Sequence, residues 1–395
     1  MTAGRRASTL QPLLAGVVGT VTGFFGSVAV LLAGLTAAGA TAEQAASGLV
    51  ALCVAQGVLS IVLSWRLRIP VCFAWSTPGA ALLVAAHREG GSFGTAVGAF
   101  LLAGVLTAGT GAVPALARFV DRIPPALTGA LLAGVLLPFC LAPVTEAVRL
   151  PLLVLPLVAG WLLLSRFAPR AAGPVVIVTA LVVTVLQGTA GAAVPPLPML
   201  APPALDPVGV VALGVPLYLV TMAGQHLPGF AVLRANGYVP PTRPALVVSG
   251  LASAVVAPFG GVGVNLAAIT GAIMVGHDAG EDRSRRWLSG VASGCTYLLL
   301  AGTAGLVAGI VGEAPPALVE AAAGLALLGA FVGAVSSALE RPDTRVPAAV
   351  TFLIVGSGIA VAGVGSAFWG LLVGGIALAV LARRPPAAGD ASPMP

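Results

Sequence analysis

Apolar segments, separated by short stretches rich in arginine, proline, glycine or acidic residues, follow one another along almost the whole chain. Each segment is about as long as a helix that crosses a ~30 Å hydrocarbon core. A transmembrane barrel would instead show ~10-residue alternating segments. The pattern therefore predicts an all-α polytopic membrane protein with about fourteen transmembrane segments. The predicted segments are 12–38, 43–64, 70–87, 92–117, 124–141, 147–164, 173–188, 208–233, 243–257, 258–277, 286–309, 315–337, 346–361 and 363–382.

The composition agrees with this pattern. Of the 395 residues, 58% are hydrophobic and 8% are charged, whereas a soluble domain has roughly 25% charged residues. This excludes a soluble globular enzyme and a disordered chain. The four cysteines lie inside apolar segments without paired spacing, so we interpret them as small buried side chains rather than disulfides or metal ligands. We expect no metal and no cofactor.

The charges indicate topology. All 19 basic residues are arginines, and the net charge is +6. They stand singly or in small groups between apolar segments, so they do not form a surface for nucleic acid. With a cytoplasmic N-terminus, 17 arginines fall inside and only Arg88 and Arg149 outside. This predicts both termini on the cytoplasmic side of the cell membrane. The first apolar stretch is longer than a ~7–15-residue signal core and is predicted to be a membrane helix.

A proline-rich segment, residues 191–207, is predicted to lie outside and separates two groups of seven segments. An odd number of crossings per half inserts the second half upside down relative to the first. This predicts two inverted seven-segment repeats, the plan of many secondary transporters. The short match of Ala29–Gly34 to Ala231–Asn236 is in keeping with a repeat.

The third and tenth segments are predicted to be broken into a short extended stretch and a half-helix. In the third, Thr77 followed by Pro78 predicts a helix start in mid-membrane. In the tenth, the glycine-rich stretch 260–263 leads to Asn265 as the predicted N-cap of a helix over residues 266–277. In inverted halves the two half-helix N-termini would face each other. Their free N–H groups would form an anion site. The alternative is that both breaks are packing kinks.

The eighth segment supplies polar side chains. Tyr218, Thr221 and Gln225 follow a spacing of i, i+3 and i+7, which predicts one polar helix face. His226 lies beside them at a depth where an ionisable group indicates function, and histidine titrates near neutral pH. We predict that His226 carries the proton. The alternative is a neutral histidine hydrogen-bonded to a backbone carbonyl. Glu320 ranks below His226 as a proton site. We expect His87 and His277 to be solvated at the interfaces.

Three motifs carry a resemblance to a known family. FAWSTPGAALL (Phe73–Leu83), MAGQHLPGFAVLRANGY (Met222–Tyr238) and APFGGVGVNLAAITGAI (Ala257–Ile273) resemble the benzoate/proton symporter family, and the resemblance covers essentially the whole chain. That family looks like a branch of the seven-plus-seven fold of uracil permeases and sulfate-type transporters. The resemblance implies a core domain at 1–122 and 208–310 and a gate domain at 123–190 and 311–384, with a linker at 191–207 and a cytoplasmic tail at 385–395.

The resemblance also implies where substrate binds: between segments three and ten, beside segments one and eight. There, amides and hydroxyls could hold a carboxylate, and aromatic rings could flank a substrate ring. Phe25 and Trp75 are further aromatic candidates. The predicted substrate-binding residues are Ser76, Thr77, Tyr218, Thr221, Gln225, Asn265, Phe73 and Phe24, with His226 as the proton-coupling residue.

The predicted function is proton-coupled import of benzoate or a similar aromatic carboxylate by alternating access. Its partners are then the carboxylate, protons and the lipid bilayer, with a homodimer left open. The alternatives are a transporter of the same fold for another organic anion or a nucleobase, and an anion exchanger. The resemblance implies that nucleobase transporters of this fold use acidic residues on segments eight and ten. No acid lies within residues 208–233 or 258–275, so a nucleobase is disfavoured. A membrane enzyme needs clustered catalytic groups, which are absent from the sequence pattern. A passive channel would not accumulate its substrate.

Overall fold

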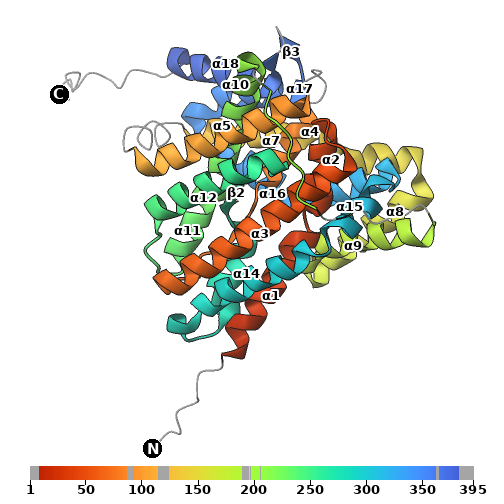
Figure 1. The fold of residues 1–395 in the computed structure, drawn as a ribbon. Coiled ribbons are helices and arrows are strands. Elements are labelled where there is room, and N and C mark those ends of the chain that lie inside the picture. Colours follow the sequence, from red (N-terminus) through yellow and green to blue (C-terminus); the bar gives the residue numbers. More distant parts are fainter. Residues whose placement is uncertain are drawn as a thin grey trace, which may run out of the picture.

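The computed structural model describes residues 9–86, 92–113, 124–188, 195, 197–204, 206–361 and 364–381, and its regular structure is almost entirely helical. The first half contains α1 (Leu10–Phe25), α2 (Val28–Ala37), α3 (Ala42–Leu67), β1 (Phe73–Trp75), α4 (Thr77–Ala86), α5 (Phe93–Ala112), α7 (Pro125–Arg149), α8 (Pro151–Phe167) and α9 (Pro169–Leu186). The second half contains α10 (Pro207–Thr221), η2 (Met222–His226), α11 (Leu227–Ala235), α12 (Thr242–Val256), η3 (Ala257–Phe259), β2 (Val264–Leu266), α13 (Ile269–Val275), η4 (His277–Ala279), η5 (Arg283–Arg285), α14 (Trp287–Ala301), α15 (Ala304–Gly312), α16 (Pro316–Leu339), η6 (Pro342–Thr344), α17 (Arg345–Ser357), β3 (Ala360–Val361), β4 (Val364–Gly365) and α18 (Ser366–Leu381). Figure 1 shows their arrangement.

The predicted segments correspond to these elements. Within the described residues, seven helices are long and apolar enough to cross a membrane, or eight if the bent pair α14–α15 is one span. Three further apolar helices are shorter, covering residues 151–167, 171–186 and 366–381. The third and tenth segments each consist of a strand and a short helix, as predicted. The polytopic helical fold with two broken segments is therefore confirmed.

The contacts between helices repeat from one half to the other. Helix α5 packs on α12, and α3 packs on α14, so segment four meets nine and segment two meets eleven. Likewise α10 packs on α5, and α1 packs on α14, so segment eight meets four and segment one meets eleven. Exchanging the halves turns each contact into its partner, as two inverted repeats require.

The glycines at these crossings explain how closely the matched helices approach. A Cβ atom at Gly250 of α12 would lie 2.6 Å from the carbonyl oxygen of Gly104 of α5. A Cβ atom at Gly57 of α3 would lie 2.9 Å from the carbonyl oxygen of Gly294 of α14. Small residues allow membrane helices to pack backbone against backbone. The same device thus serves both halves.

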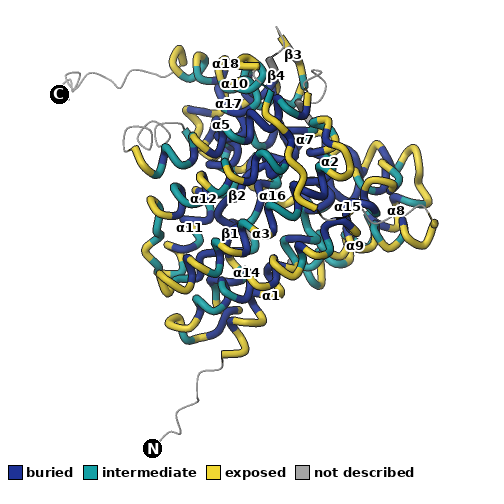
Figure 2. Tube along the Cα trace, viewed as in Figure 1, coloured by how far each residue is buried: buried dark blue, intermediate teal, exposed yellow. Residues whose placement is uncertain are grey.

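The six helices of segments five to seven and twelve to fourteen pack against one another. Helix α16 contacts α7, α8 and α9, and α17 contacts α7 and α18. Helices α8 and α9 form one side of the molecule in Figure 1, and Figure 2 shows that much of their outer surface is exposed, while the centre is buried. Leu152 and Phe167 of α8 are among these exposed apolar residues. The division into core and gate domains, with its boundaries, stays a prediction.

Three breaks were not predicted. The first segment is interrupted at Gly26 and Ser27, between α1 and α2. The eleventh segment bends by 60° between α14 and α15. The eighth segment contains the π-helical turn η2. Glycine occurs at each break (Gly26, Gly302 and Gly224), but glycine is common in membrane helices, so the sequence did not single these positions out.

Candidate functional site

The two broken segments meet in a short antiparallel pairing of β1 with β2. The register joins Phe73 to Leu266, Ala74 to Asn265 and Trp75 to Val264. A serine on the preceding helix holds each strand. Ser60 of α3 accepts a hydrogen bond from the Phe73 N–H at 3.0 Å, and Ser253 of α12 accepts one from the Val264 N–H at 2.8 Å. These equivalent serines, buried on apolar helices, satisfy backbone groups that otherwise have no partner in mid-membrane.

The half-helix α4 begins one residue earlier than predicted. Ser76, not Thr77, is the N-cap, because its Oγ accepts from the Gly79 N–H at 3.0 Å and its carbonyl accepts from the Ala80 N–H. Thr77 is then the first helical residue, and Pro78 the second. The Thr77–Pro78 pair indicated the right place, but both hydroxyl residues are compatible with an N-cap. Proline is tolerated in the first turn, so it did not choose between them.

The prediction for the tenth segment was wrong in detail. Asn265 is not an N-cap but the central residue of β2, where its side-chain Nδ2 donates to the carbonyl of Gly263 at 3.3 Å. The helix α13 starts at Ile269 and ends at Val275, before His277. The strand pairing with β1 keeps Asn265 extended, and this long-range contact overrides its capping preference.

The far end of α13 is held by two side chains. Arg286, which is 3% exposed, donates from Nη1 to the Val275 carbonyl and from Nε to the Gly280 carbonyl, both at 2.8 Å. Ser289 Oγ donates to the Met274 carbonyl at 2.7 Å. A cation is favourable at a helix C-terminus, where it complements the dipole. The short half-helix is thereby anchored at the end opposite to the strand pairing.

The π-helical turn η2 positions the eighth segment against both strands. Pro228 has no N–H, and its ring would collide with the carbonyl four residues earlier, so the helix widens just before it. The Leu227 N–H accordingly bonds to the Met222 carbonyl. Gly224 of this turn lies against Pro78 of α4, since a Cβ there would come 3.1 Å from the proline ring. Thr221 Oγ1 donates to Ser76 Oγ at 3.0 Å, linking the turn to the start of α4.

His226 is the last residue of this turn. Its side chain is completely buried, and neither ring nitrogen has a hydrogen-bond partner in the described part of the chain. The Asn265 amide is adjacent but not in hydrogen-bond geometry, and the Phe230 ring stacks at 6.3 Å. The alternative in which the histidine bonds a backbone carbonyl is therefore not found. A buried polar group without partners requires an explanation, such as a bound proton or ligand.

Three predicted residues are buried in contacts within the protein: Tyr218, Phe24 and Phe73. The Tyr218 hydroxyl bonds Thr110 Oγ1 of α5 at 2.5 Å, and Thr221 Oγ1 bonds Ser76 Oγ at the start of α4, so both hydroxyls are engaged by neighbouring segments. Phe24 is fully buried, with edge-to-face contacts to Phe25 and Trp75 at 5.2 and 5.5 Å. Phe73 is also fully buried, in the strand pairing.

Two other predicted residues keep polar side chains that the described structure does not engage. Thr77 and Gln225 are half-buried, and their side chains make no hydrogen bond to the described residues. Thr270, in the first turn of α13, lies against Gly23 of α1, where a Cβ would come 2.9 Å from its methyl group. Sequence reasoning missed Thr270, although it is the second residue of α13, as close to the start of its half-helix as Pro78 is in α4. His277 is exposed as expected, and His87 lies outside the described residues.

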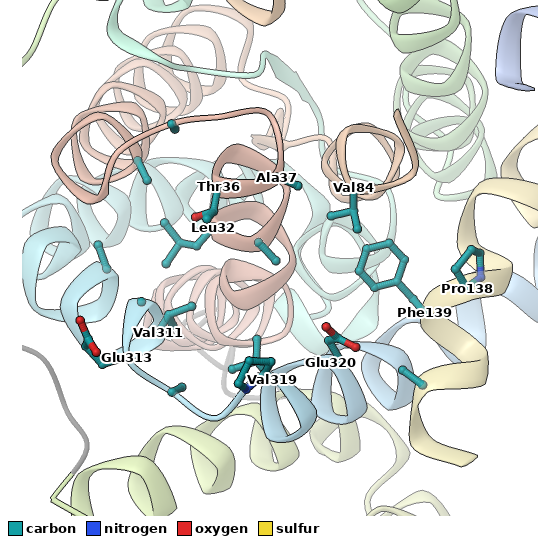
Figure 3. A pocket seen from close by; sticks show the side chains of 18 of the residues that line it. Leu32, Thr36, Ala37, Val84, Pro138, Phe139, Val311, Glu313, Val319 and Glu320 are labelled. Atoms are coloured by element: carbon teal, nitrogen blue, oxygen red, sulfur yellow. The ribbon is translucent and has the colours of Figure 1, made fainter. Parts of the chain in front are cut away.

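A large cavity lies beside this region. It has a volume of about 1000 Å³ and is lined by α2, α7, α15, α16, α17, the start of α3 and the C-terminal part of α4. Val84 lines it and is eight residues beyond Ser76 on the same half-helix, roughly 12 Å along its axis. None of the predicted substrate-binding residues lines the cavity. Glu320 does, and Figure 3 shows its side chain between α2 and Phe139.

Comparison with known proteins shows which family and which solved structures this chain resembles. The profile of the family described as "Benzoate membrane transport protein" matches residues 7–380. The inner membrane protein YdcO of Escherichia coli is 36% identical over 373 residues, covering 93% of this chain and 95% of that protein. The benzoate membrane transport protein of Acinetobacter baylyi is 31% identical over 379 residues, covering 95% and 96%. The transmembrane domain of the cyanobacterial bicarbonate transporter BicA has the same fold, with a TM-score of 0.54 and 16% identity over 94% of this chain and 97% of that one.

Proposed function

Since the chain belongs to the family of benzoate membrane transport proteins, and is thus a membrane transporter rather than an enzyme, we propose that it imports benzoate or a similar aromatic carboxylate together with protons. The inner-membrane relative supports the cell membrane as its location. In this proposal the core domain moves against the gate domain, so that the site faces each side of the membrane in turn. Both termini lie in the cytoplasm.

The observation that carries the proposal is the buried imidazole of His226, which has no hydrogen-bond partner among the described residues. A protonated imidazole is a double donor with a positive charge, and a substrate carboxylate beside it would neutralise that charge inside the membrane. Thr77 and Gln225 can donate further hydrogen bonds, and Thr77 lies at the N-terminus of α4, the positive end of its helix dipole. Proton and substrate would then bind together more favourably than either alone.

A physical reason favours symport. A carboxylic acid with a pKa near ~4 is an anion at neutral pH. Importing one negative charge against an inside-negative potential costs about 2.3 kcal/mol per 100 mV. A proton carried with it removes this cost and adds the pH gradient as a driving force. Uptake without protons would have to work against the potential.

Two loop carboxyl groups can be set aside as proton carriers. Hydrogen bonds from Ser284 hold the pKa of Asp282 below its usual range, and the Arg341 guanidinium does the same for the pKa of Asp343. A lowered pKa keeps both groups ionised through the neutral range, so neither exchanges a proton there. His226 is the group that suits this role by position and type.

The test is uptake of labelled benzoate into proteoliposomes with and without an inward proton gradient. We expect accumulation that collapses with a protonophore. His226→Ala should abolish gradient-driven accumulation while leaving measurable benzoate binding. His277→Ala is the matched control, because that histidine is exposed at the end of η4, and it should behave as the parent. Gradient-driven uptake that persists in His226→Ala would reject the proton role. No benzoate uptake by folded parent protein would redirect the search to other organic anions.

A further inference from the structure

The cavity described above has one polar feature that the proposed function does not use. Its walls are mostly apolar or small side chains, including Leu32, Val84, Phe139 and Val319. Among the residues that the structure describes, Glu313 and Glu320 are the titratable ones in its lining. The lining belongs to the ends of helices that the arginine pattern predicts to be extracytoplasmic. We call this cavity the vestibule. Within this described lining, an anion that enters the vestibule meets two carboxylates.

Glu320 is the carboxylate directed into the vestibule. It lies in the second turn of α16, and Figure 3 shows it pointing into the space beside Phe139, opposite Leu32 and Thr36 of α2. Glu313 follows the last residue of α15 and lies on the other side of the cavity. Of the two, Glu320 is the closer to Phe139 and Val84, which line the vestibule towards α4 and α7.

The charges that face Glu320 come from α7. Glu146 repels the Glu320 carboxylate and Arg149 attracts it, but Arg149 already pairs with Glu146 at 3.1 Å. The other helices that pack on α16 and line the vestibule, α2 and α17, place no titratable side chain in its wall. The Glu320 carboxylate thus has a partial rather than a complete counter-charge. Its side chain is exposed in the vestibule, so its negative field extends into a partly enclosed space whose walls are mostly apolar or small side chains.

We propose that Glu320 is a charge filter for the vestibule, which opposes a small carboxylate when ionised and admits it when protonated. This proposal rests on the proposed function and deepens it: an external proton would be required at Glu320 for the substrate to approach, separately from the proton at His226. A protonated Glu320 could also donate a hydrogen bond to the incoming carboxylate. An acidic outer solution would protonate Glu320 and open the filter, and the same inward proton gradient would drive symport.

The first test measures the charge of the vestibule without any transport. Thr36, which is exposed in the vestibule, is replaced by cysteine in a variant whose four native cysteines are replaced by serine or alanine. The protein is reconstituted in nanodiscs, and the labelling rates of a cationic and an anionic methanethiosulfonate are compared from pH 5 to pH 8. The ratio of the two rates cancels the thiolate fraction, because both reagents attack the same thiolate. It reports the local potential alone.

We expect the cation-to-anion ratio to fall by about three- to tenfold as the pH drops and Glu320 takes up a proton. Glu320→Gln should show the low ratio at every pH. Glu313→Gln, which removes the same charge from the opposite side of the vestibule, should keep most of the pH response. A ratio in the parent protein that does not change with pH would overturn the proposal, and so would equal effects of the two substitutions.

A second arm links the filter to uptake. In proteoliposomes, Glu320→Gln should flatten the dependence of the benzoate KM on external pH while accumulation still requires the proton gradient. The two proposals fail separately. If benzoate is not transported but the labelling ratio depends on Glu320, the proposed substrate is wrong and the charge filter stands. If the cation-to-anion labelling ratio is the same in the parent and in Glu320→Gln, the filter is rejected whatever the uptake shows.

Discussion

At the scale of single residues, neighbours in the sequence have different roles in this site. Ser76 and Thr77 are adjacent hydroxyl residues, yet only Ser76 caps α4 and accepts from Thr221. Thr77 is half-buried without a hydrogen bond to the described residues. Its hydroxyl is therefore free to contact a ligand, whereas the hydroxyl oxygen of Ser76 already accepts hydrogen bonds from the Gly79 N–H and from Thr221.

This difference predicts opposite phenotypes. Ser76→Ala removes an N-cap and should lower the free energy of unfolding by about 1 kcal/mol. Thr77→Val leaves the cap intact and should change stability little, but it should weaken benzoate binding if the hydroxyl contacts substrate. Thermal unfolding in detergent and binding of labelled benzoate measure the two effects. Equal stability losses in both variants would contradict the assignment of the cap.

At the scale of elements, the site depends on interruptions of otherwise continuous helices. Thr221, directly before the π-turn, bonds Ser76 at the start of α4, and Asn265 of the strand pairing lies beside His226 at the end of that turn. Each interruption frees backbone groups in mid-membrane, and a specific partner satisfies them: Ser60 and Ser253 for the strands, and Arg286 for α13. Helices α3 and α12, which carry the two serines, must in turn pack closely enough on their neighbours to hold these serines at the strands.

The crossing of α5 and α12 tests this requirement. Gly250→Leu would drive a side chain into the backbone of Gly104 and Ala108, so we expect a loss of stability of about 1–3 kcal/mol or more. Gly333→Leu on α16 is the control, since a Cβ there meets nothing within 4 Å and the mutant should unfold as the parent does. Thermal unfolding in detergent measures both. A similar loss in the two variants would contradict the role of the close crossing, because helix propensity favours leucine over glycine at both positions.

At the scale of the whole molecule, the inverted arrangement relates the two halves. Helix α3 holds the broken segment of the first half and packs on α14 of the second half. Helix α12 holds the broken segment of the second half and packs on α5 of the first half. This arrangement is compatible with either absolute orientation in the membrane. The distribution of the arginines predicts the direction.

The predicted orientation can be measured by cysteine labelling in intact cells. In a variant without the native cysteines, Glu43→Cys lies at the start of α3 and Val239→Cys lies after α11, and both positions are exposed. A membrane-impermeant maleimide should label Glu43→Cys from outside and label Val239→Cys only after the cells are opened. The reverse pattern would place both termini outside and would move the vestibule to the cytoplasmic face.

The sequence by itself determined the class of the protein, its fourteen segments, and the places where the third and tenth segments break. These properties follow from local composition: apolar length sets a span, and proline and glycine interrupt it. The family motifs are local as well. Tertiary structure decided which residues meet. Thr221 and Ser76 are separated by 145 positions, and the strand pairing that removes Asn265 from its predicted cap joins the two halves. Likewise Tyr218 turns to Thr110, and Glu320 enters a vestibule, because helices remote in sequence pack there. Such contacts depend on how whole helices pack, which no local pattern records.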